Sequence, residues 1–236
     1  MKVSSFSEKG NRSENEDFVL SKSLNENTSI HIVADGMGGY AHGSLAASTV
    51  TNTIVEYIRE NLLDNSSFEN IIQSAINQSN TSIQKLRTEY NDKMGTTLAG
   101  ILLFNHQAYC FWLGDVRIYH LRENKILFQS KDHSLVNELV NKGQILTSQE
   151  AQQYQHIVTK SVQGNSEELE PEVVPINGLS EYDSFIICSD GVHGVIGSAE
   201  MEMMVQSSTD TNSFKEAVKE KCDKKGNDNY SMIILK

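Results

Sequence analysis

The sequence predicts an α+β domain in which antiparallel strands pack in layers against helices. Apolar residues recur every three or four positions over 42–63 and again over 68–86, which is typical of amphipathic helices. Residues 97–128, in contrast, have the pattern of consecutive strands joined by short polar turns. Strands joined by short turns pair antiparallel, because a parallel pair needs a long crossover. Runs of strands followed by pairs of helices therefore favour an α+β fold over a βαβ fold.

The other elements follow from the same patterns along the chain. Short apolar runs bounded by turn residues predict strands, and apolar residues at helical spacing predict helices. Strands are expected, in chain order, at 18–20, 30–34, 97–104, 108–113, 116–121, 125–128, 172–176, 184–188 and 230–235. Helices are expected at 42–63, at 68–86, at 133–151 with a break at residues 142–143, at 198–206 and at 213–222.

Composition limits the class of protein. The chain has 236 residues and a net charge of −11 at pH 7, which suits a single domain over residues 1–236 and a monomer. No apolar run is long enough to cross a membrane. The first ten residues lack the apolar core of a secretion signal, so a cytoplasmic location is expected. An acidic chain without a basic block is a poor partner for nucleic acid, whose phosphates need neutralising.

The three cysteines do not suggest a disulfide framework or a zinc site. Cys110, Cys188 and Cys222 are odd in number and contain no CxxC pair. Cys110 and Cys188 lie inside apolar strand-like runs, where a cysteine acts as a small buried hydrophobe.

Acidic residues gather where predicted strands end. Asp35 and Asp190 each follow an apolar strand and precede a glycine, and further aspartates occur in polar loops at Asp17, Asp115 and Asp228. A carboxylate after a buried strand is held rigidly, and the following glycine lets the backbone approach closely. Mg²⁺ and Mn²⁺ prefer oxygen ligands of this kind. Several carboxylates in one cavity would otherwise raise one another's pKa.

Each of these loops also has a simpler explanation when it is taken alone. Asp-Gly is common in turns. Asp115 could pair with Arg117, and Arg12 could be an ordinary surface arginine. The acidic excess could serve solubility only. Only the joint pattern indicates a metal site.

In chain order, these segments resemble the motifs of the metal-dependent protein phosphatases of type 2C, over nearly the whole chain. The matching segments are Arg12 with Asn15-Glu16-Asp17, Ala34-Asp35-Gly36-Met37-Gly38-Gly39, Met94-Gly95-Thr96-Thr97, Gly114-Asp115-Val116-Arg117-Ile118-Tyr119, Asp132-His133-Ser134, Cys188-Ser189-Asp190-Gly191 and Asp228-Asn229. The Asp-Gly-Met-Gly-Gly segment is the most specific and is close to the bacterial form. The resemblance implies a four-layer α-β-β-α sandwich of two antiparallel sheets flanked by helix pairs, with a flap at about residues 132–165.

The resemblance also implies a role for each loop. Asp35 would bridge two Mn²⁺ or Mg²⁺ ions, with the main-chain oxygen of Gly36 on one of them. Asp190 and Asp228 would complete the ligands of the other ion. Asp17 would bind metal directly or through coordinated water.

Further residues would support this centre. Asp115, together with Asp190, would hold a third and weaker ion. Arg12 would clamp the substrate phosphate, since a guanidinium fork matches phosphate oxygens. Glu16, Asn229 and His42 would lie behind the ligands. Two ions about 3.5–4 Å apart can activate a bridging water for in-line attack on phosphorus.

Two departures from the family pattern concern the leaving group and the flap. Met37 stands where animal relatives carry a histidine proposed as a general acid, so a metal-bound water is the expected proton donor. Thr159-Lys160-Ser161-Val162 replaces the family's Thr-Arg-Ala-Leu, and Gly164 comes one residue late. Flap geometry and substrate choice are therefore expected to differ from those of relatives.

The expected function is hydrolysis of phosphoserine and phosphothreonine in proteins, the targets of a serine/threonine kinase, in bacterial signalling. One alternative is a catalytically silent relative that binds phosphoproteins or regulates another protein. Another is a phosphatase for phosphohistidine, phosphoarginine or a small phosphate ester. Because Asp17, Asp35, Asp190 and Asp228 are all present, the active enzyme is favoured.

Overall fold

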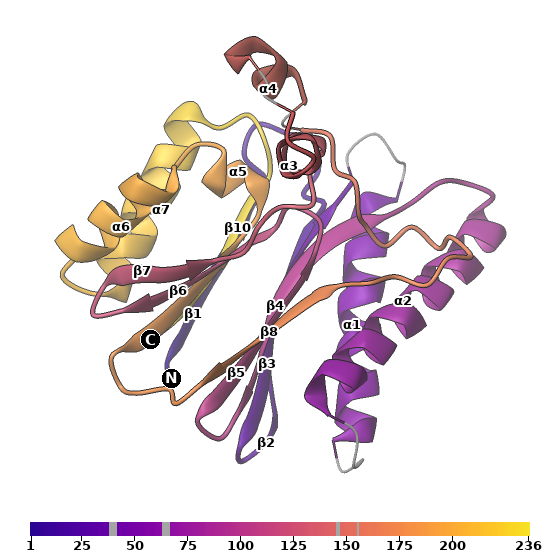
Figure 1. Ribbon diagram of the computed structural model, residues 1–236, viewed down its shortest axis with the longest axis horizontal. Coiled ribbons are helices and arrows are strands. Elements are labelled where there is room, and N and C mark those ends of the chain that lie inside the picture. Colours follow the sequence, from indigo (N-terminus) through magenta and orange to yellow (C-terminus); the bar gives the residue numbers. More distant parts are fainter. Residues whose placement is uncertain (38–41, 63–66, 145–146, 155) are drawn as a thin grey trace.

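Two face-to-face sheets form the centre of the molecule. The computed structural model describes residues 1–37, 42–62, 67–144, 147–154 and 156–236. Within these residues, ten strands pair into two antiparallel sheets of five strands each. Helices cover the outer face of each sheet, as Figure 1 shows. The predicted α+β class and four-layer sandwich are confirmed.

Sheet A has the strand order β1-β10-β9-β6-β7. Its strands are β1 (Val3–Glu8), β6 (Arg117–Arg122), β7 (Lys125–Gln129), β9 (Asp183–Cys188) and β10 (Tyr230–Leu235). Helices α6 (Ser198–Ser207) and α7 (Thr211–Lys225) pack on its outer face. Met201 and Phe214 of these helices form an apolar cluster with Ile186 of the sheet.

Sheet B has the strand order β2-β3-β4-β5-β8. Its strands are β2 (Asp17–Asn25), β3 (Thr28–Gly36), β4 (Thr96–Phe104), β5 (Gln107–Leu113) and β8 (Glu172–Asn177). Helices α1 (Gly43–Asn61) and α2 (Phe68–Tyr90) cover its outer face. Over the described residues, no helix is both long and apolar enough to cross a bilayer.

Strand β3 shows why a continuous apolar run occurs in an antiparallel sheet. Ile30 and Ile32 pack in the cluster with α1 and α2, whereas Val33 packs in the cluster between the two sheets. A strand with both faces buried loses the usual alternation of apolar and polar residues. Trp112 is 4% exposed and packs in the same layer between the sheets.

Two elements of the structure were not predicted. Strand β1 lies at the edge of sheet A, and Phe6 is its one buried residue, so the strand lacks an apolar run that would reveal it. Helix α5 (Asp190–His193) is a single short turn directly after β9, and a pattern of helical spacing needs a longer segment.

The expected flap segment contains α3 (Leu135–Asn141) and α4 (Ser148–Tyr154). Gly143, with φ of 77°, follows α3 at the predicted break. No residue of α3 is buried, and Figure 1 shows both helices projecting above one end of the sandwich. An isolated bridge between Ser134 and Val158 connects the two arms of the segment, and a second one, between Thr96 of β4 and Val162, joins the segment to sheet B.

Candidate metal centre

Four of the predicted carboxylates come from strand ends at one end of the sandwich, two from each sheet. Asp17 begins β2 and lies directly opposite Asp35 of β3 in the strand register. Asp190 follows β9 and Asp228 precedes β10, and these two strands are antiparallel neighbours. The end of one strand and the start of its antiparallel neighbour share a sheet edge, which explains why residues far apart in sequence meet here.

The carboxylates oppose one another's ionisation. Burial raises the pKa of Asp35 well above its usual range, and the nearby charges of Asp17, Asp190, Asp115 and Asp228 raise it further. Burial likewise raises the pKa of Asp17 to about 6 and that of Asp190 to about 6. Like charges in direct cross-strand register are unfavourable. The set thus has a strong need for positive charge.

Asp17 provides a test of whether metal ions fit. Its Oδ2 accepts a hydrogen bond from the Ser189 hydroxyl at 2.8 Å, but its buried Oδ1 has no hydrogen-bond partner. A buried acceptor without a partner costs free energy, whereas an oxygen ligand of a hard divalent ion needs no other partner. The donor set, all carboxylate and carbonyl oxygen, therefore fits Mn²⁺ or Mg²⁺.

The two Asp-Gly pairs bring backbone into close contact, as predicted. A Cβ atom on Gly36 would lie 2.5 Å from the main-chain oxygen of Gly43, and one on Gly191 would lie 1.9 Å from that of Asn229. No larger residue fits without displacing the loop that it touches. The remaining glycines of the second motif, Gly38 and Gly39, lie outside the described residues.

Asp115 lies in the turn between β5 and β6. Burial, followed by the nearby charges of Asp190 and Asp132, raises its pKa to about 7. Arg117 does not pair with it; its guanidinium donates to both carboxylate oxygens of Asp132 at 2.8 and 2.6 Å. The alternative that Asp115 is simply the ion-pair partner of Arg117 is therefore wrong. Asp115 and Asp190 line a common cavity of about 340 Å³.

Arg12 and Asp228 form an ion pair at the rim of the site. Arg12 Nη2 donates to Asp228 Oδ2 at 2.6 Å, and its Nε donates to the main-chain oxygen of Asn227 at 3.1 Å. Both side chains are partly exposed, by 52% and 39%. Over the described residues, no group of three or more His, Cys, Asp or Glu is already gathered as a ready-made ligand set, and Asp228 is turned onto Arg12 instead.

Asn229 and Glu16 join the loops that carry the aspartates. Asn229 Oδ1 accepts from the main-chain N–H of Glu16, and its Nδ2 donates to the main-chain oxygens of Lys9 and Glu14, each at 2.8–2.9 Å. The main-chain oxygen of Glu16 accepts from Gly36 N–H at 3.2 Å. Burial raises the pKa of the Glu16 carboxyl, which Arg12 opposes.

The ring of His42 packs against Tyr90 at the end of α2, with ring centres 4.7 Å apart. Two contributors were not anticipated from the sequence. Ser189 bonds both Asp17 and the Ser231 main chain, and His193 bonds the main-chain oxygen of Asp115 at 2.9 Å. Both lie within two residues of the Asp190-Gly191 pair, but nothing in their residue types indicates which distant loop each one contacts.

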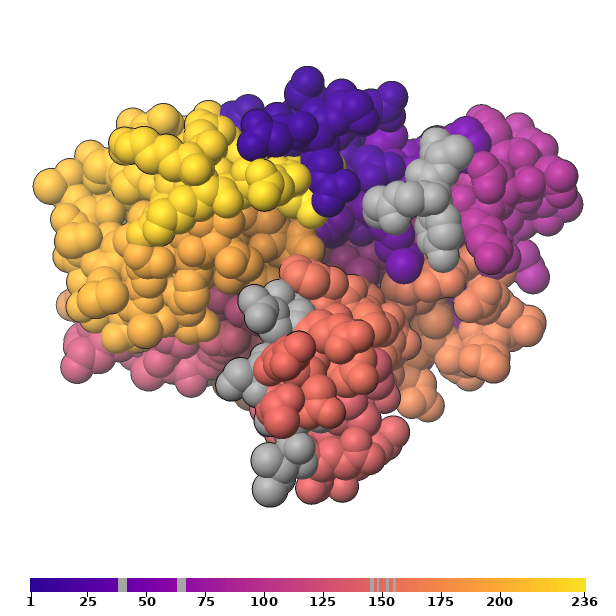
Figure 2. Space-filling model, turned by 90° about the horizontal axis from the view of Figure 1, so that it is seen from above, coloured from indigo at the N-terminus to yellow at the C-terminus, as the bar shows by residue number. Residues whose placement is uncertain are grey.

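Seen from above in Figure 2, residues from the early part of the chain (indigo), residues from its late part (yellow) and the flap segment surround this end of the sandwich, whereas the two termini lie toward the other end in Figure 1. The centre thus lies between segments that are far apart in the sequence. Carboxylate oxygens of this kind are suited to divalent cations, and the arginine beside them is suited to an anion. This combination suits a reaction on a phosphate group.

Comparison with known proteins agrees with this chemistry. The family model "Protein phosphatase 2C" matches residues 7–230. The protein phosphatase PhpP of Streptococcus pneumoniae is 30% identical, over 83% of this chain and 80% of its own length.

Solved structures show the same fold. The serine/threonine phosphatase Stp1 of Staphylococcus aureus has a TM-score of 0.88 with 26% identity, covering 99% of this chain and 94% of its own. The catalytic domain of the phosphatase PstP in complex with two manganese ions has a TM-score of 0.82 with 25% identity, covering 99% and 96%. This chain belongs to the protein phosphatase 2C family of metal-dependent serine/threonine phosphatases.

Proposed function

We propose that the chain removes phosphate from phosphoserine and phosphothreonine of proteins at the centre formed by Asp17, Asp35, Asp190 and Asp228. The observation that carries this assignment is that Asp17, Asp35 and Asp190, whose pKa values are all raised, meet at one end of the sandwich, and that the buried Oδ1 of Asp17 has no hydrogen-bond partner. Such a set exists stably at neutral pH only when cations balance it. Its substrates are proteins phosphorylated by a serine/threonine kinase.

The residues divide the work of holding the ions. Asp35 and the main-chain oxygen of Gly36 are proposed to hold the ions together with Asp17 of the neighbouring strand and with Asp190 and Asp228, which adjoin strands of the opposite sheet. When bound, a pair of Mn²⁺ or Mg²⁺ ions neutralises phosphate charge and lowers the pKa of water. Asp115, which shares a cavity with Asp190, is proposed to hold a third ion.

Arg12 is proposed to bind the substrate phosphate. Its guanidinium already lies against a carboxylate, Asp228, which has oxygen acceptors like those of a phosphate. When phosphate binds, its oxygens replace those of Asp228 as the acceptors for Arg12. Asp228 is then free to turn toward the other aspartates. Bidentate arginine–phosphate bonds are short and charge-assisted, so this exchange both orients the ester and completes the carboxylate set.

Met37 borders this site but cannot supply a proton. Its main-chain N–H donates to the oxygen of Gly95 at 3.1 Å, and its sulfur faces Gln163 Nε2 at 3.7 Å. A thioether carries no ionisable proton. Protonation of the leaving serine or threonine oxygen is therefore assigned to water held in the site.

The experiment that tests this function is hydrolysis of p-nitrophenyl phosphate and of a phosphothreonine peptide with Mn²⁺, with Mg²⁺ or with EDTA. Asp35→Asn is expected to abolish metal-dependent turnover of both substrates. Asp210→Asn is the matched control, because it makes the same chemical change at the start of α7 and asparagine still caps a helix.

Three results would contradict the proposal. Turnover that persists in EDTA and in Asp35→Asn would show that the aspartates are not the catalytic centre. A folded protein that binds Mn²⁺ without any turnover would identify a silent phosphoprotein-binding relative. Turnover of p-nitrophenyl phosphate without turnover of phosphothreonine or phosphoserine peptides would point to another phosphorylated substrate.

A further inference from the structure

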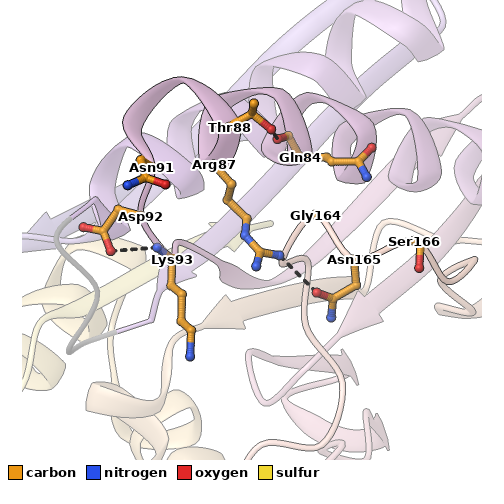
Figure 3. A pocket seen from close by; sticks show the side chains of 9 residues that line it. All are labelled: Gln84, Arg87, Thr88, Asn91, Asp92, Lys93, Gly164, Asn165 and Ser166. Carbon is orange, nitrogen blue, oxygen red and sulfur yellow. Dashed lines mark hydrogen bonds between the residues drawn. The ribbon is translucent and has the colours of Figure 1, made fainter.

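A large open cavity lies beside the catalytic end, between the C-terminal end of α2 and the chain that returns from the flap. Its volume is about 780 Å³. Figure 3 shows the residues that line it, with Arg87 and Lys93 on one wall and Gly164, Asn165 and Ser166 on the other. We call it the α2 cavity. None of the residues so far assigned to catalysis lines it.

The α2 cavity carries net positive charge within an acidic chain. Arg87, Lys93 and Asp92 are its charged lining residues. The Asp92 carboxylate accepts a hydrogen bond from the main-chain N–H of Lys93 at 2.7 Å and so stabilises the turn in which it lies. Figure 3 shows the Lys93 side chain extending away from Asp92, on the same side as Arg87. The two cations therefore face the open space together.

The opposite wall is rigid. The buried side chain of Asn80 donates to the main-chain oxygen of Asn165 at 2.8 Å and accepts from the N–H of Gly164 at 2.7 Å. Gly164 has φ of +69°, and a Cβ there would lie 2.5 Å from the main-chain nitrogen of Gln84. The loop is thus clamped onto α2, and its donors are fixed before any ligand arrives.

Arg87 ties the two walls together. Its Nη1 donates to Asn165 Oδ1 at 3.1 Å and also to the main-chain oxygen of Gln163. With Oδ1 engaged in this way, the Nδ2 group is the end of the Asn165 amide that can donate to a ligand. Guanidinium, ammonium and amide N–H groups at one opening are donors suited to a carboxylate.

A single residue separates this cavity from the catalytic turn. Gln163 presents its main-chain oxygen to Arg87, while its side-chain Nε2 contacts Met37 Sδ at 3.7 Å. Met37 lies two positions after Asp35 on the same turn. An extended peptide advances about 3.3 Å per residue. Three residues of extended peptide therefore span about 10 Å.

We propose that the α2 cavity binds an aspartate or glutamate of the protein substrate that lies about three residues from the phosphorylated serine or threonine. This inference rests on the proposed function and adds a substrate class to it. Arg87 and Asn165 form the fixed part of the subsite, and Lys93 supplies a second positive charge at its mouth. The enzyme thereby favours acidic sequences although its own net charge is −11.

The test compares phosphothreonine peptides that differ only in one flanking residue. One peptide has glutamine throughout, and others carry glutamate three or four residues before or after the phosphothreonine. Phosphate release with Mn²⁺ gives kcat/KM for each. The wild-type protein is expected to prefer one acidic peptide by about fivefold, and the preference should shrink as salt is raised.

Variants at Lys93 locate the effect. Lys93→Gln should remove most of this preference, and Lys93→Glu should reverse it, changing the ratio of the two kcat/KM values by about tenfold. Lys85→Glu is the matched control, because it makes the same charge change on an exposed residue of α2 outside the cavity. The ratio in that control should equal the wild-type ratio.

The outcomes separate this inference from the proposed function. If the wild-type protein hydrolyses acidic and neutral peptides equally well, or if Lys85→Glu shifts the ratio as much as Lys93→Glu does, the subsite is wrong. If no phosphopeptide is hydrolysed while p-nitrophenyl phosphate is, the proposed protein substrate fails first. Circular dichroism of each variant confirms that the ratios compare folded proteins.

Discussion

The Nε2–H of His193 donates a hydrogen bond to the main-chain oxygen of Asp115 at 2.9 Å. His193 ends α5, the short helix that begins at Asp190. Helix α5 therefore carries Asp190 at its start and, through His193 at its end, holds the backbone of Asp115. Asp190 and Asp115 are the two carboxylates that line the shared cavity. Burial, and then the charge of Arg117, lowers the pKa of His193 to about 4, so the ring is neutral at pH 7 and keeps a single proton for this bond.

Loss of this bond is expected to weaken the binding of the proposed third ion and to leave the binding of the first two ions unchanged. His193→Phe should loosen the weakest Mn²⁺ site by about fivefold, the worth of one hydrogen bond, as measured by isothermal titration calorimetry. His193→Gln, whose amide can still donate, should bind Mn²⁺ like the wild type. In an Asp115→Asn background, His193→Phe should have no further effect; an additive loss would show that the ring acts on general stability instead.

Arg12→Lys tests the phosphate clamp. Lysine keeps the positive charge but loses the two-pronged geometry that matches phosphate oxygens. KM for a phosphopeptide and the inhibition constant of inorganic phosphate should rise together, by about tenfold, with a smaller change in kcat. Lys9→Arg, in the same loop, serves as the control for loop disturbance. An unchanged inhibition constant in Arg12→Lys would contradict the assignment.

Gly191→Ala should be costly for packing reasons alone. The new methyl group would lie 1.9 Å from the main-chain oxygen of Asn229, so the loop that carries Asp228 must move. Overpacking of this kind costs about 1–3 kcal/mol, measurable by urea denaturation, and Mn²⁺ affinity should fall as well. Gly197→Ala is the matched control, because its added methyl group meets nothing within 4 Å. Equal stability of the two variants would refute the close contact.

Asp183 gives a pH dependence far from the metal centre. Its carboxylate is buried and accepts hydrogen bonds from Arg122, His120 and the Ser180 N–H. Burial opposes ionisation of Asp183, but these donors outweigh it and hold the pKa of the carboxyl well below its usual value.

A carboxyl with a lowered folded-state pKa stabilises the protein above its unfolded pKa of about 4, and this stabilisation is lost as the pH falls below that value. Asp183→Asn should therefore cost about 2 kcal/mol at pH 7. The difference from the wild type in urea denaturation should narrow between pH 5 and pH 3. A difference that stays constant over this interval would show that packing, and not charge, is responsible.

Local patterns predicted the parts of the fold that depend on burial. The helical spacing of Ala47, Val50, Ile54 and Ile58 places all four in the interior beneath α1. Strand β1 escaped prediction because its stability comes from hydrogen bonds to β10 and not from its own side chains. Its sequence therefore carries little of the signal that burial produces.

In the candidate site, too, the residues with a local sequence signature were predicted, and the contacts between distant segments were not. Asp35 and Asp190 are visible because an Asp-Gly pair after an apolar strand is a local signature. The pairing of Arg117 with Asp132 was missed, since it depends on where the flap chain crosses the β5–β6 turn. The contact of His193 with Asp115 was missed for a similar reason: 78 residues separate the partners, and only the packing of α5 brings them together.

Because each sheet contributes two of the four aspartates, the acidic set exists only while the sandwich is closed. Any opening between the layers would separate Asp17 and Asp35 from Asp190 and Asp228, and would relieve their mutual repulsion. Without cations, these residues therefore push the two sheets apart. Bound ions would neutralise these charges and connect the two sheets. The free energy of unfolding would then rise with the concentration of free ions. The concentration of free metal ions would then affect the stability of the packed sheets as well as the catalytic activity.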